Sequence, residues 1–386
     1  GVKENAEGDL FYRGYSVYDL IQGKPGSQGF EETCFLLLYG YLPSKADLRN
    51  FISIVRSLYA LPDDFLEMNL LRLPGKNLMN KLQHATLTLY NYDEDNPDDT
   101  DPYKTMLKGV NLLAKFPSIA CYAYQSKVHH FDRGSLIIHY PREDYSIAEN
   151  ILYMLREDKK FSPKEAELLD AILVLHADHG GGNNSTFTNV VISSTGTDLY
   201  SSISGSIGSL KGPRHGGANV KVSEMMEQVI DEIGYSTDEN TIKALIRKIL
   251  AGDFYDHTGL VYGFGHAVYT VSDPRAEILR RCCETVAKEQ FKMEEFNFYR
   301  LFEQCTKEVI LEDKNKVIPT NVDYYSGFAY EMLQIPRDMY TPLFVISRLV
   351  GWVAHNLENK LYDGKIMRPA TKYVGENVDY IPMKER

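Results

Sequence analysis

Apolar residues recur three or four positions apart along most of the chain, which is the spacing of one face of an α-helix. The segment 162–176 shows the pattern best, with Ala166, Leu169, Ile172 and Leu173 on one face. Ser162 can cap this helix, Pro163 suits its first position, and Glu165 completes a capping box. The spacing therefore predicts a helix that starts after Ser162 and ends at an inward-pointing His176.

The same spacing, with start and stop residues, predicts helices over most of the remaining sequence. They cover 31–40, 44–59, 78–90, 104–126, 145–156, 197–210, 219–233, 238–250, 274–290, 294–312, 322–333 and 340–359. We expect Pro117 to kink or end the helix around it. We find no series of strand-like segments between turn residues, and no regular alternation of strands with helices as in βαβ units. The pattern predicts a mainly α fold.

Residues 91–102 interrupt the helices with six acidic residues and two prolines. A calcium-binding EF-hand loop would need a central Gly and a terminal Glu, which this segment lacks. We therefore expect a solvated surface loop.

The composition narrows the class of protein. The chain has 386 residues, with 42 basic and 53 acidic side chains and a net charge of −11, which argues against general nucleic-acid binding. Convergent arginines could still bind a small anion. The sequence has five cysteines, an odd number whose spacing matches no zinc site. We therefore expect reduced thiols and a cytoplasmic protein. The chain begins without Met or an apolar signal core, so an upstream targeting segment is left open, and no apolar run is long enough for a membrane helix.

Four histidines lie beside glycine-rich or short polar turns: His176, His179, His215 and His266. Glycine lets the backbone approach a ligand closely, so such histidines can face a pocket. His176, Asp178 and His179 could be metal ligands, but one helical turn places Asp178 off the face that the two histidines share. We therefore expect no metal.

A dinucleotide loop at 263–265 is also not expected, because the third glycine is missing.

Two charged residues stand in unusual contexts. Asp323 lies between a proline turn and a predicted helix, and on local sequence alone we favour a helix cap. Arg348 interrupts an apolar helix, and a buried guanidinium needs a partner. That partner is either an internal Asp or Glu or the carboxylate of a ligand.

Together these segments resemble the citrate synthase family, from Gly8 almost to the end of the chain. The segment 8–15 looks like the family's opening, and 35–43 and 114–119 are similar to later family segments. The most specific matches, in this order and spacing, are His-Ala-Asp-His (176–179), Gly-Pro-Arg-His-Gly-Gly-Ala-Asn (212–219), Gly-Phe-Gly-His-Ala-Val-Tyr (263–269), Asp-Pro-Arg (273–275) and Asn-Val-Asp-Tyr-Tyr-Ser-Gly (321–327).

The resemblance implies a multi-helical homodimer, with a large domain formed by 1–219 and 334–386 and a smaller mobile domain formed by 220–333. It implies an acyltransferase that joins acetyl-CoA to oxaloacetate and hydrolyses the citryl thioester to citrate and CoA. No metal or other cofactor, no nucleic acid and no membrane is expected.

The resemblance also assigns roles to residues. Asp323 matches the catalytic base, His215 the hydrogen-bond donor to the thioester oxygen, and His266 the group that polarises the ketone of oxaloacetate. The further oxaloacetate ligands are His179, Arg275, Arg348 and Arg368, with Arg368 supplied by the neighbouring subunit. The candidates for CoA contacts are Gly263, Phe264, Gly265, Lys314 and Lys316.

Some features leave alternatives open. Gly180 stands where many relatives have Glu, and Arg214 where Leu is frequent; Asn183 could orient the His179 loop. The rival functions are a 2-methylcitrate synthase that uses propionyl-CoA, a metal-dependent hydrolase built on 176–179, and an inactive binding or scaffold protein. Retention of His215, His266 and Asp323 argues against the last.

Overall fold

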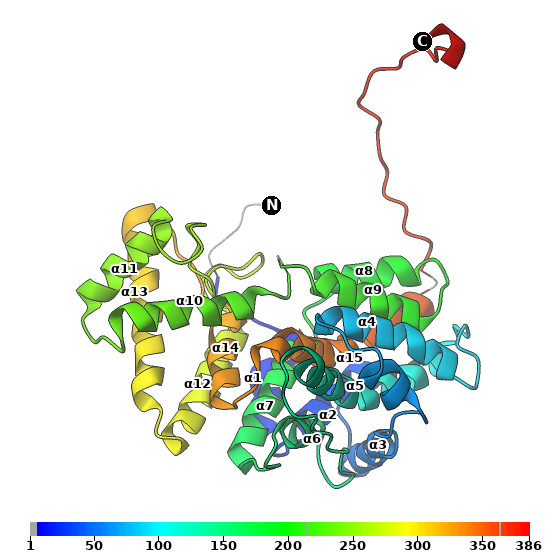
Figure 1. The fold of residues 1–386 in the computed structure, drawn as a ribbon, viewed down its shortest axis with the longest axis horizontal. Helices are drawn as coiled ribbons and strands as arrows, with labels where there is room; N and C mark the ends of the chain where they lie inside the picture. The colour runs from blue at the N-terminus through cyan, green and yellow to red at the C-terminus, as the bar shows by residue number, and fades with distance from the viewer. Residues whose placement is uncertain (1–5, 214, 363) are drawn as a thin grey trace.

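The computed structural model describes residues 6–213, 215–362 and 364–386, and helices dominate it (Figure 1). The mainly α prediction is confirmed. Among the described residues the only sheet is a short hairpin of β1 (Phe11–Tyr12) and β2 (Tyr15–Ser16). The α-helices are α1 (Val17–Gly23), α2 (Gly29–Tyr39), α3 (Lys45–Ser57), α4 (Leu78–Leu89), α5 (Pro102–Phe131), α6 (Ile147–Leu155), α7 (Pro163–His176), α8 (Asn184–Ser193), α9 (Leu199–Leu210), α10 (Ala218–Ile233), α11 (Glu239–Ala251), α12 (Pro274–Glu289), α13 (Met293–Lys314), α14 (Val322–Met332) and α15 (Tyr340–Leu361). A π-helical turn, η1 (Leu66–Leu71), and three 3₁₀ turns, η2 (Tyr90–Tyr92), η3 (Arg337–Met339) and η4 (Met383–Glu385), complete the helical elements.

The predicted start of α7 is confirmed in detail. Ser162 accepts a hydrogen bond from the Glu165 amide at 3.2 Å, and Glu165 Oε2 accepts one from the Ser162 amide at 2.7 Å. His176 ends the helix and is buried, as the apolar spacing predicted.

Pro117 does not end its helix, because α5 continues past it to Phe131. Almost every residue around Pro117 in α5 is buried. The free energy gained by burying these side chains outweighs the roughly 3 kcal/mol that a proline costs inside a helix. The prediction that the helix could stop here is wrong.

The helices form two groups in Figure 1: α10 to α14 lie together on one side, and α2 to α9 with α15 lie on the other. Within the first group α14 packs against α10 and α12. Within the second, α15 packs against α5, α7, α8 and α9, and Trp352 and Arg348 on it are fully buried. The groups meet where α12 packs against α7.

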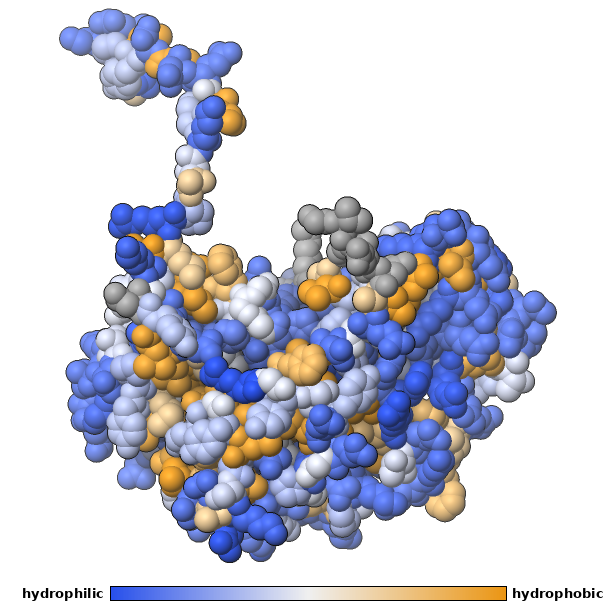
Figure 2. All heavy atoms as spheres, turned by 180° about the vertical axis from the view of Figure 1, so that it is seen from behind, coloured by the Kyte–Doolittle hydropathy of each residue, from blue (hydrophilic) through white to orange (hydrophobic). Residues whose placement is uncertain are grey.

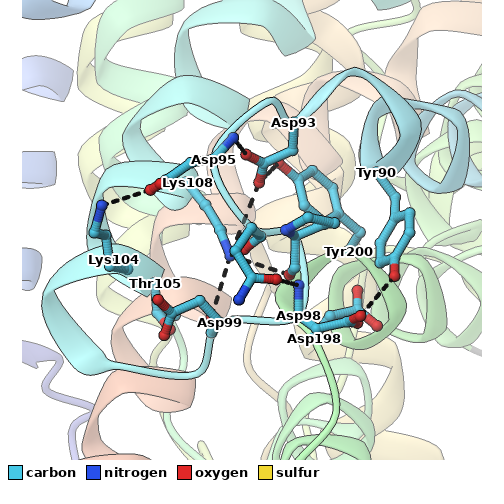
Figure 3. Close-up of polar contacts among 12 residues, drawn as sticks. Tyr90, Asp93, Asp95, Asp98, Asp99, Lys104, Thr105, Lys108, Asp198 and Tyr200 are labelled. Atoms are coloured by element: carbon cyan, nitrogen blue, oxygen red, sulfur yellow. Dashed lines mark hydrogen bonds and ion pairs between the residues drawn. The ribbon is translucent and has the colours of Figure 1, made fainter.

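Most of the acidic segment 91–102 is a surface loop between η2 and α5, and Lys108 of α5 reaches into it (Figure 3). The Lys108 ammonium donates to the carbonyls of Pro97 at 3.0 Å, Asp99 at 3.1 Å and Asn96, and it lies 3.8 Å from the Asp93 carboxylate. The Lys108 side chain is only 7% exposed. The chain's own ammonium group therefore supplies the cation around which this loop folds.

Residues 364–386 form an exposed tail that leaves the body of the protein (Figures 1 and 2). Its start is attached to the end of α8, where the Met367 amide donates to Ser194 Oγ at 3.1 Å. Hydrophobic side chains of the tail, among them Val374 and Val378, are exposed. Across the described ranges, the helices are too short or too polar to cross a membrane.

Candidate active site

Arg348 lies at the centre of the site, on the buried face of α15. Its Nε donates to the carbonyl of His176 at 2.6 Å, and its two terminal nitrogens, Nη1 and Nη2, have no hydrogen-bond partner within the described part of the chain. Burial lowers the pKa of Arg348 from 12.5 to about 10, so the guanidinium stays charged at neutral pH. A buried cation with two unused donor groups is suited to an anionic ligand.

Arg275 provides a second buried guanidinium at the start of α12. Asp273 caps this helix and also binds the side chain: its Oδ1 accepts from the Arg275 amide and Nε, both at 3.0 Å, and its Oδ2 from Nη2 at 2.7 Å. Arg275 Nη2 also lies 3.2 Å from His266 Nε2. Asp273 thus fixes the guanidinium against His266, a role that the sequence analysis did not find.

His266 follows the glycine turn, and its Nδ1 accepts hydrogen bonds from the amides of Val268 at 3.0 Å and Tyr269 at 3.1 Å. The proton of a neutral ring is therefore on Nε2. His266 Nε2 and Arg275 Nη2 lie 3.2 Å apart, and with the ring proton on Nε2 both nitrogens can donate to one ligand oxygen placed beside them.

His179 packs against His266, with their ring centroids 5.2 Å apart. Burial, with the charges of Arg275 and Arg348, lowers the pKa of His179 to about 2, so the ring is neutral. His179 Nε2 is buried and has no hydrogen-bond partner among residues 6–213, 215–362 and 364–386.

His215 belongs to a separate polar group around Ser185 at the start of α8. His215 Nε2 lies 3.1 Å from Ser185 Oγ, Trp352 Nε1 donates to the same oxygen at 3.2 Å, and Ser185 donates to Asn183 Oδ1 at 2.9 Å. Burial, followed by the charge of Arg348, lowers the pKa of His215 to about 4. The ring is therefore neutral at neutral pH. Ser185 contacts the ring directly and Trp352 supports Ser185, and the sequence did not single out either residue.

Asp323 is not the cap of α14. Asn321 has that role, since its Oδ1 accepts the Asp323 amide at 3.1 Å, so the cap expected from local sequence is wrong by two residues. The side chain of Asp323 is left free for other contacts. Burial raises its pKa from 3.8 to about 6, and the nearby Arg275 partly opposes this rise.

The glycine turn 263–265 is joined to the segment that precedes Asp323. The Gly265 amide donates to the Pro319 carbonyl at 2.8 Å, and the Asn321 amide donates to the Gly263 carbonyl at 2.9 Å. Gly263 and Gly265 have φ values of 87° and 90°, which favour glycine. Between them, Phe264 pairs with Thr320.

The structure brings most of the predicted site residues together. His179, His266, Arg275, Arg348 and Asp323 are linked by charge interactions that shift pKa values among them, and His215 is influenced by Arg348. Lys314 and Lys316 lie at the exposed end of α13. Arg368 lies in the exposed tail and does not join the site of its own chain. Arg214 is outside the described residues.

The residues of the metal hypothesis have other contacts. His176 Nδ1 lies 2.8 Å from the Ile172 carbonyl, and Asp178 lies 3.2 Å from His355 Nε2. In the ranges that the structure describes, no group of three or more His, Cys, Asp or Glu side chains could hold a metal ion. Asp178 also accepts from the amide of Gly180 at 3.0 Å, and Gly180 has a φ of 80° that favours glycine.

Comparisons with known proteins agree on one family. The family model described as "Citrate synthase, C-terminal domain" matches residues 2–370. A citrate synthase from Haloferax volcanii is 36% identical over 386 residues, covering 98% of this chain and 93% of the relative. A 2-methylcitrate synthase from Shewanella oneidensis is 33% identical over 367 residues, covering 95% and 88%. The solved citrate synthase of Thermoplasma acidophilum, in a ternary complex with carboxymethyl coenzyme A and oxaloacetate, has a TM-score of 0.81 and 27% identity, covering 98% of this chain and 93% of that one.

Proposed function

The chain belongs to the citrate synthase family, and we propose that it condenses acetyl-CoA with oxaloacetate and hydrolyses the citryl thioester to citrate and CoA. Such an enzyme is an acyltransferase in which the acetyl group becomes an alkyl group. The observation that carries the proposal is the buried guanidinium of Arg348, with two terminal nitrogens that no described residue binds, beside the second buried guanidinium of Arg275.

Oxaloacetate has two carboxylates and a ketone, and these groups match the donors of the site. Arg348 would bind one carboxylate bidentately through its two terminal nitrogens, and Arg275 would bind the other through Nη1, because its Nε and Nη2 already donate to Asp273. Nε2 of His179, a ring whose pKa both guanidinium groups lower, would provide a further hydrogen bond. The ketone oxygen would accept from His266 Nε2 and Arg275 Nη2, which are 3.2 Å apart, and this would make the carbonyl carbon more electrophilic.

Acetyl-CoA must lose a methyl proton before it can attack that carbon. Asp323 would accept this proton, since a pKa of about 6 leaves the carboxylate ionised at neutral pH and makes it a stronger base than an ordinary aspartate. Neutral His215 would donate from Nδ1 to the thioester oxygen and so stabilise the enol; for this, the Ser185 hydroxyl would turn from Asn183 and donate to His215 Nε2. Each effect is worth on the order of 10²–10⁴-fold in rate.

CoA itself would contact the glycine turn of Gly263, Phe264 and Gly265, whose backbone can approach a ligand closely. Lys314 and Lys316 at the end of α13 would bind its phosphates.

We propose a homodimer as the working assembly, because Arg368 lies in a tail that leaves its own site. In a dimer this tail would bring Arg368 to the oxaloacetate of the partner subunit. We further propose that residues 220–333 form a mobile domain, and that 1–219 and 334–386 form the large one.

A thiol-release assay with oxaloacetate and either acetyl-CoA or propionyl-CoA tests the function. We expect CoA release to be faster with acetyl-CoA and unchanged by EDTA. A faster reaction with propionyl-CoA would instead favour a 2-methylcitrate synthase, the name of the Shewanella relative. Release that depends on a metal and not on oxaloacetate would contradict both.

A further inference from the structure

Glu303 lies on α13, and it binds the chain on both sides of Asp323. Thr320 Oγ1 donates to Glu303 Oε1 at 2.6 Å, and the Tyr325 hydroxyl donates to Oε2 at 2.5 Å. One carboxylate therefore holds a residue three positions before Asp323 and another two positions after it.

The segment held by Glu303 also carries the turn before His266. Thr320 pairs with Phe264, and the neighbouring Pro319 carbonyl accepts the Gly265 amide at 2.8 Å. The Asn321 side chain also donates to the Gly265 carbonyl at 3.0 Å. A displacement of Thr320 would therefore move the approach to His266 as well as the start of the helix that carries Asp323.

The surroundings of Glu303 keep its carboxylate charged and fixed. The residue is 6% exposed, with Lys307 Nζ at 2.6 Å and Arg280 Nη1 at 3.7 Å. Two cations and two hydroxyl donors offset the cost of burying the charge. Although burial raises the pKa of Glu303, Lys307 and the two hydroxyl groups lower it further, to below its ordinary value.

A second bond from α13 supports the same segment. The Tyr324 hydroxyl donates to the Tyr299 carbonyl at 2.8 Å, and Tyr299 precedes Glu303 by one helical turn. Both tyrosines that follow Asp323 are therefore tied to one face of α13.

We infer that Glu303 is a positioning residue for the reaction proposed above: it holds Asp323 against the methyl group of acetyl-CoA while keeping the His266 turn in place. The inference rests on the proposed function. Reactions that depend on placement within a fraction of an ångström lose about 10²-fold in rate when a group shifts by about 1 Å.

The test compares Glu303→Ala and Glu303→Gln with Glu308→Gln, a matched control. Glu308 is also on α13, but its side chain is exposed and paired with Lys243. We expect kcat to fall about 10- to 100-fold in Glu303→Ala and less in Glu303→Gln, which keeps one oxygen acceptor. KM for oxaloacetate should change less than kcat, because Glu303 supports the His266 turn but, within the described ranges, has no hydrogen bond or ion pair with Arg275 or Arg348, which would bind the carboxylates.

The kinetic isotope effect with methyl-deuterated acetyl-CoA separates positioning from a general structural role. A misplaced base slows proton abstraction, so the isotope effect on kcat should increase in the Glu303 variants and not in Glu308→Gln. A lower kcat with an unchanged isotope effect, or variants equal to the control, would overturn the inference.

Two further measurements cover the cases in which the Glu303 variants do not fold or the wild type is inactive. Tyr325→Phe removes one hydroxyl and leaves Glu303 paired with Lys307, so it serves as the test if the Glu303 variants do not fold; an isotope effect equal to wild type would then overturn the inference. Wild-type protein that does not consume acetyl-CoA would overturn the proposed function and the inference together. If the wild type is active and the variants behave like it, the inference about Glu303 is wrong but the proposed function stands.

Discussion

Burying the charge of Arg348 makes the protein without ligand less stable, but it leaves a cation available to bind an anion. Most of the neighbours of Arg348 in α15 are apolar, and among the described residues its guanidinium has one hydrogen bond, to the His176 carbonyl. Burying a charge with so few partners is unfavourable, which is the reason that its pKa is lowered. An anionic ligand would supply the missing interactions, so binding should stabilise the folded protein.

Arg348→Met tests this opposition between stability and binding. Methionine fills similar space without a charge, so we expect the free energy of unfolding without ligand to rise by about 1–3 kcal/mol. Thermal unfolding should also no longer respond to oxaloacetate. Arg247→Met, an exposed arginine of α11, is the control and should keep the response; an oxaloacetate-dependent shift in Arg348→Met would contradict the assignment.

Asp323→Asn should nearly abolish turnover, by about 100-fold or more, while oxaloacetate still binds. In the wild type, kcat should fall as the pH drops through about 6, where Asp323 becomes protonated. A rate within tenfold of wild type would contradict the role of Asp323 as the base.

The same variant has a predicted effect on stability. Because the folded-state pKa of Asp323 lies above its ordinary 3.8, ionisation above pH 6 destabilises the folded state. The asparagine variant should therefore be more stable than wild type at pH 8, by up to about 3 kcal/mol. The difference should shrink as the pH falls from about 6 to about 4. Urea unfolding at both pH values measures it.

Among the residues predicted for the site, those whose chemistry is unusual for their surroundings could be found from local sequence, whereas Asp323, Arg275 and Arg368 were assigned through the family resemblance. An arginine in an apolar helix and histidines beside glycines can be recognised locally. Asp273, Ser185 and Trp352 could not be recognised in this way, because an aspartate at a helix start, a serine and a buried tryptophan are common. Their roles depend on partners that only the folded chain brings near, such as Arg275 and His215.

At the level of elements, capping residues and apolar spacing predicted most helices, and packing explains the exceptions. The α8 helix (Asn184–Ser193) consists largely of Ser, Thr, Asn and Val, which favour helices weakly. It nevertheless forms because it packs against α9 and α15. Packing also carries α5 past Pro117, and neither effect can be read from a local segment.

Lys108 is expected to determine the order of the acidic loop. Replacing it with Met leaves the carbonyls of Pro97 and Asp99 without their donor and removes the cation beside Asp93. We expect the free energy of unfolding to fall by about 1–3 kcal/mol and the loop 91–101 to become sensitive to proteases. Lys104→Met, which removes an exposed pair with Asp95, should have a much smaller effect, and equal behaviour of the two variants would count against this role.

For the molecule as a whole, the proposed catalytic groups are divided between the two groups of helices in Figure 1. His179, His215 and Arg348 lie in or beside α7 to α9 and α15, whereas His266, Arg275 and Asp323 belong to the segments around α12 and α14. Neither group of helices holds the full set. Local sequence patterns could not predict which helices pack together into each group; only the family resemblance suggested such a division.

This division predicts that the two substrates bind cooperatively. Oxaloacetate would contact His179 and Arg348 on one side and His266 and Arg275 on the other, and so would favour a closed arrangement of the two groups. Closure would complete the acetyl-CoA site and expel water before the thioester reacts.

A non-reactive acetyl-CoA analogue should therefore bind more tightly when oxaloacetate is present, by about 5- to 150-fold, and by linkage the analogue must raise oxaloacetate affinity by the same factor. Calorimetric titration in both orders measures the two factors. Equal analogue affinities with and without oxaloacetate would mean that the divided site does not close on its first substrate.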